Sequence, residues 1–440
     1  MPQFRIARIS LLLAAIGLSA VPALTPAALA QDKEKAGAAT PAAEAPKDSV
    51  RPEIYKLVEP AQIKALMDAK NYTEVQSRLD QAEALPNKTP YEVFVLNRMR
   101  ISLGSATNNT QMTTTALEAV INANKLQPAE QKDFIAALGN MYYNAKEYQK
   151  AITWFNRYQT ESGDNKMRPY IIRAYYFSND FATAKTELMK DLEATQKAGG
   201  TPKIEELQLL ANTGAKTKDQ ATYLLAVENL VRYYPSDDYW IDLLSRTQGK
   251  ATYSTRFALD VYRLQKAAVS KMSAEDYAEM ADLALLAGQP IEAKQALDAG
   301  FSAGVLGKGP NADKHKKLRA QADRQAADDM KNIGSGEASA RKSKNGTGLI
   351  NLGWAFVTMG QYDKGIALIQ EGITKGGLPN AEDAKLRLGY SYALAGKKDD
   401  AIKTLQTVHG TDGRGDLARY WILWVNRPAG GAAAPAQAAQ

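Results

Sequence analysis

The chain has 440 residues, of which 45% are hydrophobic and 23% charged, with a formal net charge of +7 and no cysteine. This composition supplies ample material for a core, but one compact core of this length is unusual, so several domains or a repeat array are expected. The missing cysteine excludes a disulfide framework, a thiol nucleophile, a thiolate metal site and a lipid-modified cysteine anchor.

The N-terminus has the pattern of an export signal. Arg5 and Arg8 precede an apolar stretch over 9–24, and Ala28-Leu29-Ala30 is the small-x-small sequence that a signal peptidase cleaves. An uncleaved membrane anchor is the alternative, but the apolar stretch is short for a span and contains Pro22. We therefore expect a signal peptide at 1–30, cleavage after Ala30, a periplasmic or secreted protein and no integral membrane segment in its mature form.

Two low-complexity segments flank the rest of the chain. Residues 31–50 are rich in Ala, Pro, Lys and Glu, and residues 428–440 are almost entirely Ala, Gly, Pro and Gln. Such segments lack the bulky apolar residues that a core needs, so we predict a disordered linker and a disordered tail. Between them, over 51–427, amphipathic helical stretches alternate with Gly, Asn and Pro turns, without a strand-like pattern.

The helical stretches repeat at a fixed period. Small and aromatic residues return 33 residues later in one pair of stretches and 36 residues later in another. The 33-residue matches are Tyr142, Tyr148, Ala151 and Phe155 with Tyr175, Phe181, Ala184 and Leu188, and the 36-residue matches are Gly353, Gly360 and Gly365 with Gly389, Gly396 and Ala401. Periods of this length indicate stacked supersecondary units, each of which needs its neighbours to bury its apolar face.

The motif L-G-x-x-Y followed by A-x-x-x-F, as in Leu138–Tyr142 and Ala151–Phe155, resembles the tetratricopeptide repeat family. This resemblance implies an all-α fold, a right-handed α-solenoid of stacked antiparallel helix pairs with no β-sheet. The clearest repeats lie at 132–191, 274–304 and 346–408, and weaker copies extend the count to eight or nine pairs.

An irregular basic segment, 308–345, interrupts the clear repeats. Between Lys308 and Lys344 there are ten Lys or Arg residues and only five Asp or Glu residues. The sequence Gly334-Ser335-Gly336 in this segment indicates a loop. Repeat spacing predicts one degenerate helix pair here. The segment is either a solvated face or an electrostatic patch for an acidic partner or an anionic membrane surface; the scarcity of aromatic residues argues against nucleic acid. The patch residues are Lys314, Lys316, Lys317, Arg319, Arg341, Lys342 and Lys344.

Catalytic and metal-binding chemistry is poorly represented. The two histidines, His315 and His409, are far apart in sequence and are interpreted as surface or capping residues, and the carboxylate pairs sit in polar turns or on polar helix faces. No phosphate-binding or nucleophile motif occurs. We therefore predict no catalytic residue, no metal and no cofactor, and a protein that is not an enzyme.

What remains is a binding surface. The family resemblance implies a concave groove lined by the first helix of each pair. The residue that follows the glycine of the L-G-x-x-Y motif, or that stands at the equivalent position of another repeat, is predicted to face this groove. The residues three or four positions further along the helix are predicted to face it too. These groove residues are Asn140, Tyr143, Asn144, Arg173, Tyr176, Phe177, Trp354, Val357, Thr358 and Tyr390.

Two functions from different classes remain open. The first is a scaffold that binds a protein or peptide partner in a Gram-negative envelope assembly or transport complex. The alternative is a carbohydrate-binding helical array of cell-wall or exopolysaccharide machinery, in which Trp240, Trp354, Trp421 and Trp424 stack on sugars. Clustered polar and charged groove residues would favour a peptide, and a line of exposed aromatic residues would favour a glycan.

Overall fold

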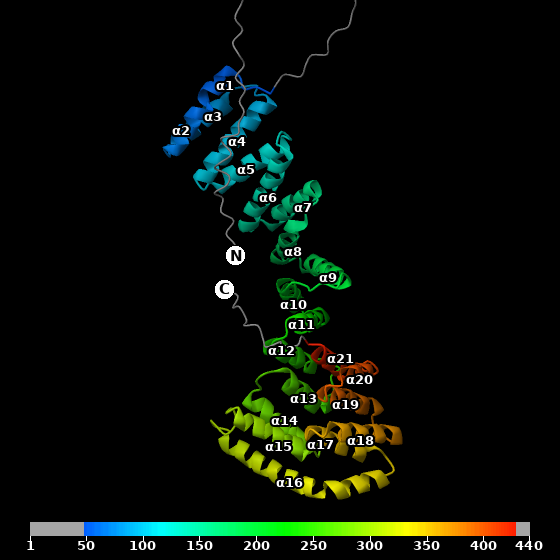
Figure 1. The fold of residues 1–440 in the computed structure, drawn as a ribbon. Coiled ribbons are helices and arrows are strands. Elements are labelled where there is room, and N and C mark those ends of the chain that lie inside the picture. Colours follow the sequence, from blue (N-terminus) through cyan, green and yellow to red (C-terminus); the bar gives the residue numbers. More distant parts are fainter. Residues whose placement is uncertain (1–47, 428–440) are drawn as a thin grey trace, which may run out of the picture. The chain divides into compact units, whose positions relative to one another are not determined.

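The computed structural model describes residues 48–427, which are entirely helical apart from turns (Figure 1). The chain divides into two compact units, Met1–Ala184 (unit 1) and Lys185–Gln440 (unit 2). The predicted signal peptide and the tail at 428–440 lie outside the described residues, as does most of the predicted linker.

Unit 1 is a succession of short helices joined by tight turns. Its elements are α1 (Pro52–Leu57), α2 (Pro60–Asp68), α3 (Tyr72–Ala84), α4 (Pro90–Ala106), α5 (Thr110–Asn122), α6 (Pro128–Asn144), α7 (Tyr148–Ser162), a 3-10 turn at Asn165–Met167, α8 (Arg168–Phe177) and the start of α9 (Phe181–Lys197). Several begin with proline in the first turn, where the missing N–H costs nothing, and α4 adds a capping box between Thr89 and Glu92.

The start of unit 1 corrects the predicted linker boundary. The sequence predicts a linker that extends to residue 50. However, Asp48 forms a salt bridge with Lys125 at 2.8 Å, and Val50 packs against the hydrophobic core. Arg51 forms a further salt bridge, at 3.0 Å, with the buried carboxylate of Glu92. These contacts join the first described residues to the helices that follow.

Unit 2 continues the succession. Its elements are the rest of α9, α10 (Ile204–Thr217), α11 (Gln220–Tyr233), α12 (Asp237–Gln248), a 3-10 turn at Thr255–Phe257, α13 (Ala258–Ala268), α14 (Ala274–Leu286), α15 (Pro290–Ser302), α16 (Ala312–Lys342), α17 (Thr347–Thr358), α18 (Tyr362–Lys375), α19 (Ala381–Leu394), α20 (Lys398–Leu405) and α21 (Arg414–Val425).

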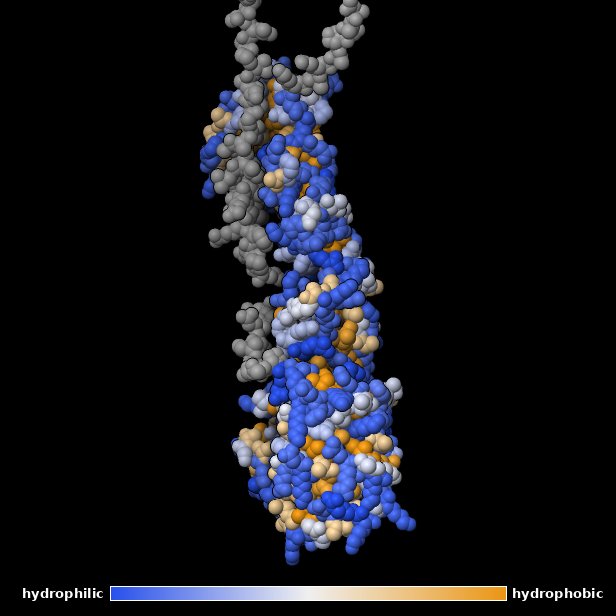
Figure 2. Space-filling model, turned by 45° about the vertical axis from the view of Figure 1, so that its right-hand side comes forward, coloured by the Kyte–Doolittle hydropathy of each residue, from blue (hydrophilic) through white to orange (hydrophobic). Residues whose placement is uncertain are grey.

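Sequential helices pack in pairs, and the pairs stack on their neighbours. The contacts within α4/α5, α6/α7, α10/α11, α14/α15, α17/α18 and α19/α20 are the most extensive, and further contacts join successive pairs. The all-α prediction of stacked helix pairs is thereby confirmed for the described residues. No described helix has the length and apolarity needed to cross a membrane. On the face shown in Figure 2, hydrophilic residues predominate and hydrophobic ones form small patches.

Glycines set the close approach of α17 and α18. A Cβ at Gly353 would lie 2.6 Å from the carbonyl oxygen of Gly365, and a Cβ at Gly365 would lie 2.5 Å from the carbonyl oxygen of Gly353. Because both obstacles are backbone atoms, neither can rotate away. The small residues that define the repeat motif are therefore required by direct backbone contact between the two helices.

These glycines give a first prediction. Gly353→Ala should lower the free energy of unfolding of unit 2 by about 1–3 kcal/mol, because the added methyl group forces α17 and α18 apart. Urea unfolding followed by tryptophan fluorescence reports mainly on unit 2, which holds Trp240, Trp354, Trp421 and Trp424.

Gly334→Ala is the matched control. Gly334 lies in the middle of α16 with nothing within 4 Å of an added Cβ, so alanine should raise helix stability by about 1 kcal/mol. A loss of stability for this variant, or none for Gly353→Ala, would contradict the packing argument.

Helix α16 departs from the predicted degenerate pair. It is one continuous helix of 31 residues that runs through Gly334-Ser335-Gly336, which we predicted to be a loop. Its first half packs on α15 through Leu318, Ala322 and Ala326, and its second half packs beside α17 through Ala340. Apolar contacts at both ends and good helix formers between them override the weak helix propensity of the two glycines.

Helix α21 closes unit 2. It contacts its sequence neighbours α19 and α20 and also α11 and α13, which precede it by about 150–190 residues (Figure 1). Trp424 donates its indole N–H to the carbonyl oxygen of Ala267 at 2.8 Å, and Thr247 and Tyr420 share a buried hydrogen bond of 2.9 Å. Unit 2 is thus a stack of helix pairs whose late helices return to its early ones.

Candidate partner-binding site

Six aromatic side chains of unit 1 form an unbroken row of ring contacts, here called the aromatic row. Neighbouring ring centroids lie 5.3–5.8 Å apart, distances typical of favourable aromatic pairs. In order of contact the row is Tyr170, Tyr143, Tyr148, Phe177, Tyr176 and Phe181. It draws on the end of α6, the start of α7, both ends of α8 and the start of α9, so successive repeats contribute to one surface.

The row rests on a buried anchor. Phe155 on α7 is fully buried and contacts the rings of Tyr143 and Tyr170 at 6.3 and 5.9 Å. Gly139 on α6 makes room for it, since a Cβ there would lie 2.6 Å from the Phe155 ring. The glycine and phenylalanine of the repeat motif therefore fix the position of the tyrosines beside them.

Polar groups accompany the row. Arg173 on α8 is half-buried, and among residues 48–427 it has no hydrogen bond or ion pair. Burial raises the pKa of Tyr143, and the positive charge of Arg173 opposes that rise. The amides of Asn140 and Asn144 on α6 are likewise uncommitted within the described part of the chain.

All six groove residues predicted in unit 1 thus keep some solvent exposure. Phe177 is the most open of the aromatic ones, with 49% of its surface exposed. Four of the six, Tyr143, Arg173, Tyr176 and Phe177, are linked through ring contacts or through the charge of Arg173. Sequence reasoning missed Tyr148, Tyr170 and Phe181 as members of this surface, although Tyr148 and Phe181 were visible as repeat-matched aromatics.

The groove prediction is wrong for three residues of unit 2. Trp354, Val357 and Tyr390 have 2%, 2% and 0% of their surface exposed, so they cannot line an open groove. Thr358 is half-buried and donates its hydroxyl to Ala355 of its own helix. The face that the repeat pattern assigns to solvent is covered in unit 2, because α21 packs against α19 and because Asp260 and Arg263 on α13 form hydrogen bonds with Tyr390 on α19.

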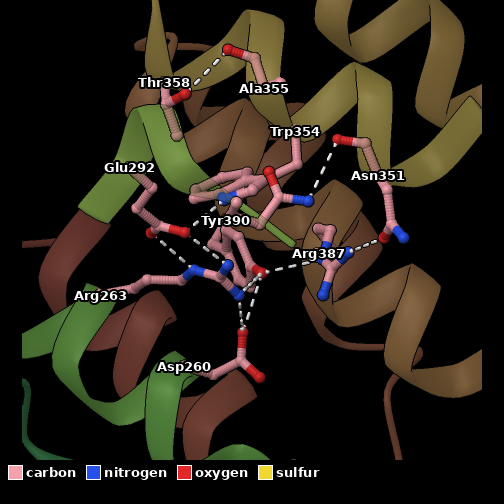
Figure 3. Close-up of polar contacts among 10 residues, drawn as sticks. Asp260, Arg263, Glu292, Asn351, Trp354, Ala355, Thr358, Arg387 and Tyr390 are labelled. Carbon is pink, nitrogen blue, oxygen red and sulfur yellow. Dashed lines mark hydrogen bonds and ion pairs between the residues drawn. The ribbon is translucent and has the colours of Figure 1, made fainter. Parts of the chain in front are cut away.

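A buried charge cluster lies where these helices meet (Figure 3). Arg263 on α13 forms a bidentate salt bridge with Glu292 on α15 at 2.8 and 2.7 Å, and bonds Asp260 at 2.7 Å. Trp354 on α17 donates its indole N–H to Glu292 at 2.9 Å, and Tyr390 on α19 donates its hydroxyl to Asp260, also at 2.9 Å. Four helices therefore meet around one guanidinium.

Within the cluster, the guanidinium and the carboxylates stabilise one another. The Arg263 guanidinium also lies 4.6 Å from the Trp354 ring centroid, a cation–π contact. Burial alone would lower the pKa of Arg263, but Glu292, Tyr390 and Asp260 outweigh it and hold the pKa well above its ordinary value. Burial and Asp260 likewise raise the pKa of Tyr390. With its members buried and mutually bonded, the cluster is structural in character.

Sequence reasoning gave no sign of this cluster. Asp260 and Arg263 precede Tyr390 by 130 and 127 residues. The repeat logic predicts contacts between neighbouring units only, so no local pattern marks a partner at that distance.

Comparison with known proteins agrees with the repeat pattern. Residues 350–410, which contain most of α17 and all of α18 to α20, match the family model described as tetratricopeptide repeat. This segment is therefore similar to a tetratricopeptide repeat. No curated protein matches the chain significantly.

Solved structures of tetratricopeptide repeat proteins are similar at low identity. A complex of the yeast Sti1 TPR2AB domain with pHSP90 is 14% identical, covers 67% of this chain and 99% of that chain, and has a TM-score of 0.23. A Parabacteroides merdae tetratricopeptide repeat protein is 14% identical, with coverages of 61% and 98% and a TM-score of 0.26. The TPR domain of P58(IPK) is 11% identical, with coverages of 85% and 97% and a TM-score of 0.22. TM-scores of this size give no basis for transferring a site or a partner.

The tryptophans that motivated carbohydrate binding are mostly packed inside unit 2. Trp240, Trp354 and Trp421 have at most 3% of their surface exposed. Trp424 is half-buried, and Arg427 lies over its ring at 3.9 Å from the centroid. Trp240, Trp354 and Trp421 therefore stabilise the core of unit 2 and cannot stack on a sugar, and Arg427 covers part of the Trp424 ring.

The predicted basic patch is not one patch. Lys314, Lys316, Lys317 and Arg319 lie at the start of α16, whereas Arg341, Lys342 and Lys344 lie at its end, about 40 Å away at 1.5 Å per residue. That separation is several Debye lengths at physiological salt. Arg319 is paired with Asp298 at 2.6 Å and Arg341 with Glu371 at 2.6 Å, so neither is an unpaired cation.

The histidines occupy different environments. His315, expected to be solvated, has only 5% of its surface exposed, and its Nδ1 accepts a hydrogen bond from the Gly307 backbone N–H at 3.3 Å. His409 is exposed after α20, as predicted. Among residues 48–427, no group of three His, Asp or Glu side chains is placed to hold a metal ion.

Proposed function

We propose that this protein is a non-enzymatic scaffold, exported to the periplasm, that binds a protein or peptide partner in a Gram-negative envelope assembly or transport complex. The observation that carries the proposal is the aromatic row of unit 1 with the uncommitted Arg173 beside it. The N-terminal pattern ending at Ala30 supports export. The lack of chemical motifs in the sequence and the structural character of the buried charge cluster support a role without catalysis.

The groups beside the aromatic row suit a peptide that combines a carboxylate with an apolar or aromatic side chain. Arg173 offers a planar, permanently charged donor suited to a carboxylate, and the amides of Asn140 and Asn144 can bond a peptide backbone. Phe177 and Tyr176 supply rigid apolar area at low entropic cost. Aromatic and arginine side chains together are the composition typical of energetically dominant interface residues.

Carbohydrate binding remains the second candidate, because the aromatic row is itself a line of aromatic residues at the surface. Its rings, however, are largely occupied by one another: Tyr143 contacts three other rings of this region, and Phe177 is stacked on Tyr148 at an interplanar angle of 27°. Sugar stacking needs an open ring face, which favours the peptide over the glycan.

The test is a comparison of purified tagged proteins incubated with envelope extract. The wild type should recover a stoichiometric protein partner, and the triple variant N144A/R173A/F177A should lose it. The reason is that removing such anchor residues should weaken binding by at least about tenfold. Asn144 and Phe177 are exposed, and Arg173 has no hydrogen bond or ion pair within the described residues, so the fold should be preserved, which circular dichroism would check.

The matched control is K56A/V93A/N156A, which removes a cation, an apolar residue and an amide from α1, α4 and α7. These side chains are also exposed and lie outside the aromatic row. Recovery of the partner by this control but not by the first variant supports the proposal. Equal recovery by both, or recovery of polysaccharide in place of protein, would refute it.

A further inference from the structure

The outward face of α16 carries a line of four cations, here called the cationic ridge. Lys317, Arg324, Lys331 and Lys342 are all exposed and follow one another at intervals of seven, seven and eleven residues. At about 100° per residue these four positions fall within about 40° of one another around the helix axis. Arg324 and Lys331, which the patch prediction left out, connect the two ends of the helix.

The ridge lies opposite the packed face of the helix. The buried residues of α16 are His315, Leu318, Ala322, Ala326 and Ala340, and their mean direction is about 165° from that of the four cations. The helix itself runs along the outer edge of unit 2 (Figure 1). The ridge is therefore convex and spans about 38 Å from Lys317 to Lys342 at 1.5 Å per residue.

The acidic residues of α16 neutralise little of the positive charge of the ridge. Asp323 pairs with Lys294 on α15 at 2.7 Å, and Glu337 pairs with Lys364 on α18 at 3.0 Å. None of the four ridge cations forms an ion pair within the described residues. Asp328 is exposed near the line between Arg324 and Lys331 and offsets part of its charge, so the ridge keeps a net charge of about +3.

We propose that the cationic ridge of α16 adsorbs to an anionic phospholipid surface. The ridge faces outward without walls, so an extended charged surface can approach it along its length, whereas a peptide would find nothing to hold it, since Gln321, Ser335 and Ala338 beside the ridge are exposed too. Each Lys or Arg close to an anionic bilayer strengthens binding by roughly fivefold. This surface is separate from the aromatic row and does not depend on the proposed scaffold function.

The experiment is co-sedimentation of the full chain with lipid vesicles. Wild-type protein should bind vesicles of phosphatidylglycerol and phosphatidylcholine, release them as salt rises from about 0.05 to 0.5 M, and bind pure phosphatidylcholine far less. The variant K317Q/R324Q/K331Q/K342Q should bind the anionic vesicles more weakly by on the order of a hundred-fold. The apolar N-terminal stretch is present in every protein compared, so its contribution cancels.

The control is K216Q/K271Q/K398Q/K403Q, which removes four exposed cations of unit 2 that form no ion pair within its described residues. It should bind nearly as the wild type does, since these positions are not on the ridge. Equal loss in both variants would show a general charge effect and overturn the proposal. Binding of soluble polyglutamate with no binding of anionic vesicles would overturn it in favour of an acidic protein partner.

Discussion

Replacing Arg263 with leucine is expected to lower the free energy of unfolding of unit 2 by about 3–5 kcal/mol, because it leaves the buried carboxylates of Asp260 and Glu292 without their cation. The side chain of Arg263 is only 3% exposed, so water cannot take over its role. Urea unfolding followed by tryptophan fluorescence would measure the loss, and the nearby indole of Trp354 should report it directly.

Arg319→Leu is the control for that substitution. Arg319 makes a salt bridge of similar length with Asp298, but both side chains are well exposed, and such surface pairs contribute about 0–1 kcal/mol. The two variants therefore make the same chemical change at a buried and at an exposed pair. Losses of equal size would show that the buried charge cluster contributes no more than an ordinary surface pair.

Trp421→Ala is expected to cost a similar amount, about 3–5 kcal/mol, because it opens a large cavity between α21 and α19. Trp421 is fully buried, and its ring stacks on Tyr390 with centroids 5.4 Å apart and contacts Trp424 at 5.4 Å. Losing it should free α21 and expose the apolar ends of α13 and α19. Circular dichroism during denaturation and a light-scattering assay for aggregation would measure both effects.

Trp421→Phe separates packing from hydrogen bonding at the same position. The indole N–H of Trp421 is buried without a partner among residues 48–427, so phenylalanine removes an unsatisfied donor while it keeps an aromatic ring against Tyr390. We expect a clearly smaller loss than for alanine. A loss as large as that of Trp421→Ala would mean that the N–H has a partner, such as a bound water, that matters to stability.

The local features of the fold could be predicted from the sequence because they depend on neighbours in the chain. The spacing of Gly139, Tyr142 and Phe155 predicts a helix pair, and the structure places these residues as the pattern requires. The same holds for Gly353 and Gly365, whose backbones touch. Weak copies, such as Val75 and Leu79 on α3, also fall on helices with their side chains buried.

The candidate site could be predicted only where the stack stays open. The rule that places Asn140 and Arg173 toward solvent also selects Trp354 and Tyr390, which stand at equivalent positions of their repeats. In unit 2, however, α13 and α21 cover that face. A repeat pattern sets the direction of a side chain within its helix pair, but not which distant helix will pack against it.

Helix α16 shows a second limit. Local preference at Gly334-Ser335-Gly336 favours a break, and repeat spacing favours a pair, yet the helix is continuous. The outcome depends on apolar contacts that anchor both of its halves, and these come from helices whose positions the sequence pattern does not supply. The cationic ridge exists only because those halves form one continuous helix.

The return of α21 to α11 and α13 also has a consequence for how unit 2 forms. Open repeat arrays depend on contacts between adjacent repeats, so they can fold progressively from any point along the chain. In unit 2 the residues that complete the core, Tyr420 and Trp421, lie on α21, the last of its described helices. We therefore expect unit 2 to acquire its protected amides in one late, concerted step, and to fold more slowly than a repeat array with local contacts alone.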